Sequence, residues 1–108
     1  MKNLLFCLIM TSSFAQAGNS DCHTRALNYF NEQGPVSTDF QKEVGADSYI
    51  LPAHKPLYNI HGDFLAIYNE DMEVFRGVGS EHSGWFENAI IVNPVSCHLV
   101  SILEIAAE

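Results

Sequence analysis

Two cysteines, Cys22 and Cys97, constrain the fold of this protein more than any other feature of its sequence. A third, Cys7, lies in an N-terminal apolar segment that we expect to be removed. In an oxidising compartment the remaining two have only each other as intramolecular partners, so we predict a Cys22–Cys97 disulfide. Closing so long a loop stabilises a small domain by roughly 4 kcal/mol. The alternatives are a free reactive thiol, or a metal site formed with the adjacent His23 and His98.

Residues 1–17 are typical of a secretory signal peptide. Lys2 provides the positive start, Leu4–Met10 the uncharged apolar core, and Ala15–Ala17 the small residues that precede a cleavage site. We expect cleavage after Ala17, with cleavage after Ala15 as the second choice. The apolar run is far shorter than the about 20 residues that a membrane-spanning helix needs.

The same segment predicts where the protein works. Neither Cys7, inside the apolar core, nor Cys22, after the polar residues 19–21, is placed like the lipid-bearing cysteine of a bacterial lipoprotein. We therefore expect an exported protein, periplasmic or extracellular, with no membrane anchor after signal cleavage. The remaining chain, residues 18–108, has the length of a single small domain.

The expected mature chain is strongly acidic. Loss of Lys2 leaves four basic residues against thirteen acidic ones, a formal charge of −9 with histidine neutral. Such a surface repels phosphate backbones and anionic membranes, so we expect no nucleic-acid partner. It attracts a protein with a basic surface or a cation, although negative charge also serves solubility alone.

The first part of the mature chain predicts a helix. Ser20 or Asp21 can cap a helix from about Cys22 to Gln33, which Gly34 and Pro35 end. The apolar residues on one side of this helix are Cys22, Ala26, Tyr29 and Phe30. After residues 37–39, the spacing of Phe40 and Val44 predicts a second short helix or an irregular segment that ends at Gly45.

From residue 48 onward the pattern predicts strands. Short extended pieces at 48–51 and 57–60 lie beside prolines, which suits an edge strand or loop. Residues 64–68 and 72–76, joined by a turn at 69–71, predict a hairpin, and the Gly- and Ser-rich residues 77–84 predict a loop. Two further strands are predicted at 85–92 and 95–105. The second should place Val95, Cys97, Leu99, Ser101, Leu103 and Ile105 on one face, although its spacing also fits a helix. The predicted fold is α+β: an N-terminal helix packed on a four- to five-stranded antiparallel sheet, with one disulfide.

Histidines raise the possibility of a metal site. The candidate ligands are His54, His61, Asp63 and His82, of which His61 and Asp63 share one face of an extended chain. Zinc needs three or four ligands in tetrahedral array, but no pair has the spacing of a helical His motif and no close cysteine pair exists. Surface and turn positions explain the same residues. A metal-binding protein of the periplasm or extracellular space is therefore the alternative function.

Catalytic motifs are lacking in the sequence. Ser80, His82 and Ser83 are neighbours that indicate no triad, and residues 77–80 differ from the nucleophile elbow. Glu70 and Asp71 lie in a predicted turn, where solvation explains them. A small enzyme of unknown reaction stays a third alternative, and we expect no cofactor.

Residues 77–88 form the segment that we predict to carry a binding function. They combine glycines, acidic groups, a histidine and the only tryptophan beside a phenylalanine, as aromatic anchors with polar neighbours do in binding patches. Because side chains alternate along a strand, only one of Trp85 and Phe86 can face the core. The predicted binding residues are Glu81, His82, Trp85, Phe86 and Glu87. The leading hypothesis is an exported non-enzymatic binding module, of the inhibitor or immunity type, for a basic partner.

Overall fold

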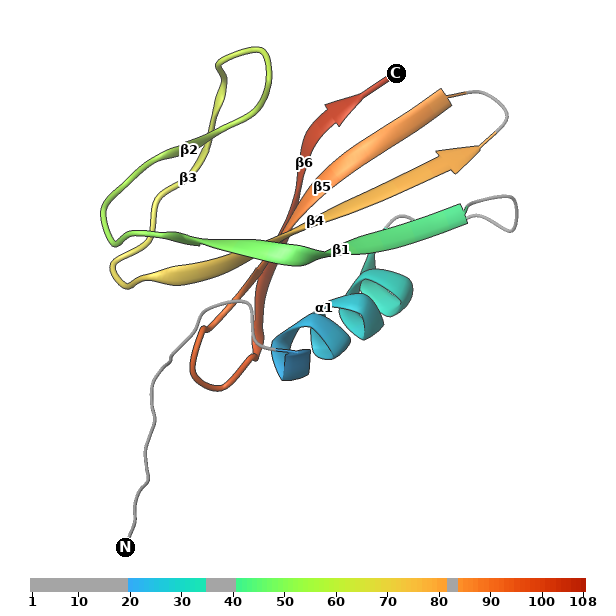
Figure 1. Cartoon of the computed structure of the whole chain (residues 1–108). Helices are drawn as coiled ribbons and strands as arrows, with labels where there is room; N and C mark the ends of the chain where they lie inside the picture. The colour runs from blue at the N-terminus through green and yellow to red at the C-terminus, as the bar shows by residue number, and fades with distance from the viewer. Residues whose placement is uncertain (1–19, 35–40, 82–83) are drawn as a thin grey trace, which may run out of the picture.

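The computed structural model describes residues 20–34, 41–81 and 84–108, so the predicted signal peptide lies outside the described residues. Its elements are α1 (Ser20–Gln33), β1 (Gln41–Leu51), β2 (Leu57–Tyr58), β3 (Phe64–Ala66), β4 (Met72–Glu81), β5 (Gly84–Val92) and β6 (Leu99–Ala107). The long strands form an antiparallel sheet in the order β1-β4-β5-β6, and β2 pairs with β3 in a separate two-stranded sheet (Figure 1). The predicted α+β class is confirmed.

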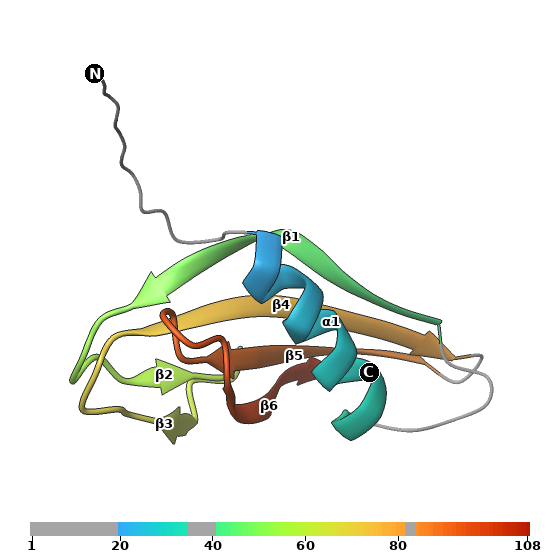
Figure 2. The same cartoon turned by 90° about the horizontal axis from the view of Figure 1, so that it is seen from below.

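Helix α1 forms where the sequence predicts it and begins at Ser20. Cys22, Ala26 and Phe30, spaced four residues apart, have exposed fractions of 0% and form the stripe that faces the sheet. The Gly34 amide donates a hydrogen bond of 3.1 Å to the Phe30 carbonyl at the end of the helix. Lys42 donates to the same carbonyl at 3.1 Å, which places a positive charge at the negative end of the helix dipole. Figure 2 shows α1 lying across the sheet.

The Cys22–Cys97 disulfide is present, with the two Cα atoms 5.1 Å apart across a sequence separation of 75. It joins the first turn of α1 to the turn that precedes β6. The prediction of the bridge is confirmed, and neither cysteine is left as a thiol or metal ligand. In the part of the chain that the structure describes, no helix is long and apolar enough to cross a membrane.

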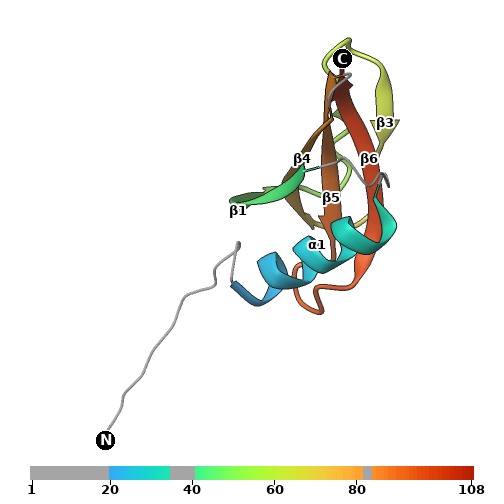
Figure 3. The same cartoon turned by 90° about the vertical axis from the view of Figure 1, so that its right-hand side faces the viewer.

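The four-stranded sheet buries apolar side chains on both faces. Figure 3 shows α1 near the bottom of the view and β3 near the top. On the face toward α1, the helix stripe packs against a cluster from all four long strands and the disulfide: Val44, Phe75, Phe86, Ile90, Val92 and Cys97, with Leu99 and Ile102 partly buried. On the opposite face, the β2–β3 hairpin contributes to a second cluster: Leu51, Leu57, Met72, Val74, Ala89 and Ile91, with Leu65, Tyr68, Leu103 and Ile105 partly buried. Helix α1 therefore packs on one face of the sheet, and the β2–β3 hairpin packs on part of the other.

The segment predicted to be a second short helix is instead strand β1, which begins at Gln41. Val44 is buried there as part of the helix-side cluster, while Phe40 lies outside the described residues. Val44 pairs with Gly77 and Ser48 with Phe75, so β1 contains two extra residues between these pairs. A spacing of four residues also falls on one face of a strand, so Phe40 and Val44 alone could not distinguish a strand from a helix.

The predicted hairpin of residues 64–68 and 72–76 is wrong. Phe64–Ala66 pairs with β2, whereas the strand that starts at Met72 pairs with β1 and β5. Asp71, predicted to lie in the hairpin turn, accepts a hydrogen bond of 2.9 Å from the Ala53 amide. The turn therefore ties β4 to the connection after β1, and long-range pairing of β1 with β4 replaces the local pairing.

The predicted loop at 77–84 is also wrong, because β4 continues to Glu81 and β5 starts at Gly84. The glycines occur in this strand because side chains of α1 and β5 pack closely on it. A Cβ atom on Gly77 would lie 2.8 Å from Cδ1 of Ile90 and 2.9 Å from the ring of Phe30. On Gly79 it would overlap the ring of Phe86. Glycine here marks close packing and not a turn.

The last strand is confirmed as a strand, but not with the predicted single face. It begins at Leu99, and Val95 lies in a turn with an exposed fraction of 92%. The Asn93 side chain holds this turn by accepting hydrogen bonds from the amides of Val95 and Ser96 at 2.8 and 2.9 Å. Cys97 has a φ of 64°, which turns its side chain toward the helix. Two register shifts along β6 then place Leu99 and Ile102 on the helix side, and Leu103 and Ile105 on the other.

Candidate functional site

The sheet face opposite α1 is covered over only one half. At the β2–β3 end, the hairpin buries Leu51, Met72, Val74 and Ile91. Toward the connection between β4 and β5, no described element lies over the same face. The side chains of this open half come from β1, β4 and β5 because alternate residues of paired strands share a face. They are Glu43, Arg76, Val78, Ser80, Trp85 and Glu87.

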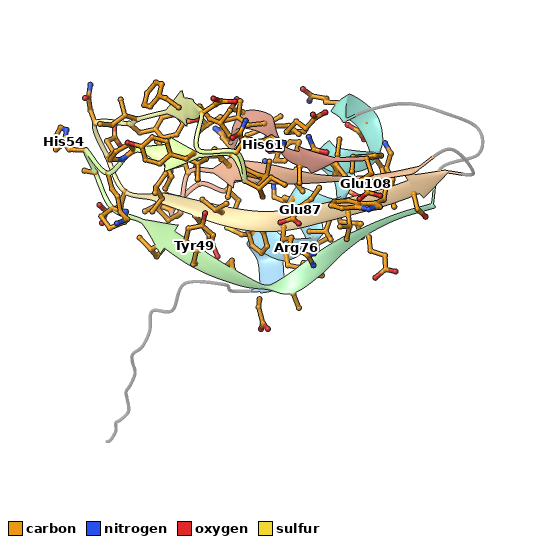
Figure 4. All side chains as sticks on the ribbon, turned by 90° about the horizontal axis from the view of Figure 1, so that it is seen from above. Tyr49, His54, His61, Arg76, Glu87 and Glu108 are labelled. Carbon is orange, nitrogen blue, oxygen red and sulfur yellow. A yellow bond between two sulfur atoms is a disulfide. The ribbon has the colours of Figure 1, made fainter. Side chains whose placement is uncertain are left out.

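Two adjoining pockets form one groove along this face, viewed from above in Figure 4. The inner pocket, with a volume of about 330 Å³, lies against the hairpin. Its mainly apolar lining comes from the hairpin, the sheet and two tyrosines: Leu57, Tyr58, Tyr49, Val74, Ala89 and Ile105. Tyr49 and Tyr58 are each 51% exposed, so their rings form walls that solvent reaches. Burial of part of Tyr49 raises the pKa of its phenol.

The outer pocket, with a volume of about 390 Å³, lies over the open half of the sheet. It is lined by Glu43, Arg76, Val78, Gly79, Ser80 and Trp85. Trp85 is 39% exposed, and its carbonyl accepts a hydrogen bond of 2.8 Å from the Glu108 amide. Glu108 thus continues the β5–β6 pairing and lies beside Trp85 on this face (Figure 4). The outer pocket therefore contains an indole and the carboxylate of Glu43, and Glu108 pairs with Trp85 at its edge.

An ion pair stands between the two pockets. Nε of Arg76 lies 3.0 Å from Oε2 of Glu87, and the Arg76 side chain lines both pockets. Glu87 is the more buried partner, with 24% of its side chain exposed against 63% for Arg76. Arg76 is the basic residue among the groove residues, and Glu87 balances its charge. Glu43 and Asp47 therefore leave the lining of the groove net negative.

The predicted binding residues are divided between the two faces of the sheet. Trp85 and Glu87 lie at the groove, as described above. Phe86 points to the other face, where it is 8% exposed and its ring meets that of Phe30 edge-on at 6.1 Å. Phe86 is therefore buried in the core and does not line the groove, because alternation along β5 directs its ring to the helix side. Glu81 ends β4, and His82 lies outside the described residues.

Sequence reasoning missed the residues that strand pairing brings to the groove. Glu43 and Tyr49 arrive through the pairing of β1 with β4, and Tyr58 through the hairpin. Arg76 belongs to the predicted strand 72–76, and alternation along that strand could have placed Arg76 on the same face as Val74. For the others no local signal was available, because the bulge in β1 shifts the register between Val44 and Ser48.

The candidate metal ligands that the structure describes, His54, His61 and Asp63, do not line either pocket. His54 is exposed in the turn after β1, at a φ of 66°, and His61 is exposed in the turn between β2 and β3 (Figure 4). The Asp63 carboxylate accepts a hydrogen bond from the Asn59 amide group at 3.3 Å. Among the residues that the structure describes, no three His, Cys, Asp or Glu side chains gather into a metal site. His82 lies outside those residues.

Comparison of the chain with protein-family models, with curated proteins and with solved structures returned no match. The groove is therefore interpreted from its own chemistry. A half-open sheet face with three exposed aromatic rings and a net negative lining can bind a surface that offers apolar and basic side chains.

Proposed function

We propose that this protein is an exported, non-enzymatic module that binds a basic partner protein through the groove. The observation that carries the proposal is the groove, whose two pockets combine the exposed rings of Tyr49, Tyr58 and Trp85 with acidic side chains in their lining. Tyrosine and tryptophan supply large contact areas at interfaces for little loss of conformational freedom. An inhibitor or immunity-type protein works in this way.

Charge supports the choice of partner. The chain contains thirteen acidic and five basic residues. Two of the basic side chains are engaged with α1: Arg25 donates to the Tyr29 hydroxyl at 3.1 Å and Lys42 to the Phe30 carbonyl. The long-range field therefore attracts a basic surface and raises its association rate at low salt.

Two features support the exported location that the proposal assumes. Residues 1–17 have the signal-peptide pattern, and the disulfide belongs to an oxidising compartment. Expression of the full chain with a C-terminal tag, followed by mass measurement of the product outside the cytoplasm, tests this part. A mass that corresponds to cleavage after Ala17 supports export, and full-length protein retained in the cytoplasm contradicts it.

Capture with matched variants tests the binding function. The immobilised mature protein is mixed with the periplasmic and extracellular proteins of its host, at low and high salt. We expect capture of a protein with a basic surface that is lost with Trp85→Ala and weakened by Glu43→Gln and by salt. Glu104→Gln is the matched control, because Glu104 pairs with Asn88 on the helix side of the same sheet. Capture that is absent at low salt, or equal for all variants, refutes the proposal.

A further inference from the structure

The two pockets lie a fixed distance apart along one strand. Val74 belongs to the inner pocket and Val78 to the outer one, and both residues belong to β4 on the same face. Strands rise by about 3.4 Å per residue, so Val74 and Val78 are separated by roughly 13 Å along the groove. An extended peptide that lies along β4 spans the same distance with residues i and i+4, and its side chains at these positions share a face.

The inner pocket suits a large aliphatic side chain. Its volume of about 330 Å³ is at the lower end of the range for small-molecule pockets. Its floor is formed by Val74, Ala89 and Ile105, and the walls by Tyr49 and Tyr58. A leucine side chain inserted there would be transferred from water into contact with apolar side chains on several sides. Burial of apolar surface of this kind is the main source of affinity at interface anchors.

The outer pocket suits a basic side chain. Glu43 lines it, and Glu108 lies beside Trp85 at its edge. The positive charge of Arg76 is balanced by Glu87 at 3.0 Å, so Glu43 and Glu108 set the local sign. The face of an indole attracts a guanidinium or ammonium group by a further about 0.5–1 kcal/mol at an exposed site. Carboxylate and indole together therefore favour arginine or lysine over a neutral residue.

We infer that the groove recognises an extended segment of its partner that carries a large aliphatic residue and, four positions away, an arginine or lysine. This inference rests on the proposed function and names the feature of the basic partner that the groove recognises. The aliphatic side chain enters the inner pocket, and the basic side chain enters the outer pocket beside Trp85. Between them the peptide backbone passes over the Arg76–Glu87 pair.

The only tryptophan of the chain lies at the outer pocket and reports binding directly. The probes are acetylated and amidated peptides of Gly and Ser, free of aromatic residues, with Leu and Arg four positions apart in either order. The tryptophan fluorescence of the mature protein is titrated with each peptide at low salt. We expect one of the two orders to bind, and Arg→Gln in that peptide to weaken binding about fivefold. Leu→Ala should weaken it about tenfold.

Spacing is the control on the peptide side. A peptide with Leu and Arg three positions apart has the same composition but points the two side chains to opposite faces when extended. It should bind no better than the peptide that has lost its Leu. Equal binding of both spacings would overturn the inference, because a simple charge attraction would then explain the signal.

Variants of the protein test which pocket takes which side chain. Glu43→Gln should weaken the Leu/Arg peptide several-fold and leave the Leu/Gln peptide unchanged. Tyr58→Ala should weaken the Leu/Arg peptide and leave the Ala/Arg peptide unchanged, while Glu104→Gln changes neither. Thermal unfolding of each variant shows that it is folded. The inference fails if no peptide binds, or if peptide binding is the same for the Glu43→Gln and Tyr58→Ala variants as for the unmodified protein. The proposed function still stands in either case if capture of a basic partner depends on Trp85.

Discussion

The Cys22–Cys97 disulfide is the feature whose removal should reduce stability most. The bridge closes a loop with a sequence separation of 75, and both cysteines are buried, at 0% and 6% exposed. On the chain-entropy model, a loop of this length lowers the entropy of the unfolded chain by about 15 cal/mol/K, equivalent to about 4.5 kcal/mol at 25 °C. The total stability of a small domain is about 5–15 kcal/mol, so the loss removes a large part of it.

Thermal and urea unfolding of the mature protein measure the loss. The variant with both Cys22→Ala and Cys97→Ala should unfold at a midpoint about 20 °C below the oxidised protein. Each single substitution should cost nearly as much as the double one, because either one breaks the bond. Reductant should lower the midpoint of the unmodified protein and leave that of the double variant unchanged.

Cys97 provides a control for the backbone. Its φ of 64° is unfavourable for residues with a side chain. In the double variant, Cys97→Gly in place of Cys97→Ala should therefore recover about 1 kcal/mol. A double alanine variant within about 1 kcal/mol of the oxidised protein would refute the reasoning, since the bridge would then constrain the unfolded chain far less than its loop length implies.

Further predictions concern the interior of the sheet and its tyrosines. Gly79→Ala should lower the free energy of unfolding by about 1–3 kcal/mol, because the added Cβ overlaps the ring of Phe86. Gly45→Ala should change urea stability little, because its Cβ would lie 3.9 Å from the Arg76 carbonyl oxygen. Ser48→Ala removes the hydroxyl that donates a hydrogen bond of 2.6 Å to the buried Glu73 carboxylate. Urea unfolding should show a loss of about 1–3 kcal/mol in the free energy of unfolding. A loss near zero would show that another donor replaces the hydroxyl. Burial raises the pKa of the Tyr68 phenol above its ordinary 10.0, so its contribution to stability is complete below pH 10 and is lost as the pH rises through the folded pKa. Tyr68→Phe should make the alkaline decline of urea stability shallower, and an unchanged decline would contradict this assignment.

Local patterns in the sequence determined the elements whose signals lie in neighbouring residues. The helix followed from its cap residues, its apolar stripe and the Gly34–Pro35 end, and β5 from its β-branched and aromatic run. The disulfide followed from counting the cysteines that remain outside the predicted signal peptide. Alternation also required Trp85 and Phe86 to face opposite sides, although it could not say which side belonged to the core.

Pairing between distant segments decided the rest. Residues 64–68 and 72–76 have the pattern of a hairpin, yet the strand starting at Met72 pairs with β1, because this pairing and the hairpin on top of it bury a larger apolar cluster. In the sequence Gly77 and Gly79 indicate a loop, whereas in the fold the rings of Phe30 and Phe86 leave no room for a side chain at these positions.

The groove belongs wholly to this second class. Trp85 and Glu87 could be selected from the sequence as neighbours along one strand. Glu43 and Tyr49 join them only through the β1–β4 pairing, whose register depends on a bulge of two extra residues. A register shift moves side chains between faces, and no local pattern encodes it, because its energy comes from side chains that meet across the sheet. The sequence by itself determined the composition of this surface, and the tertiary structure decided which of its residues share a face.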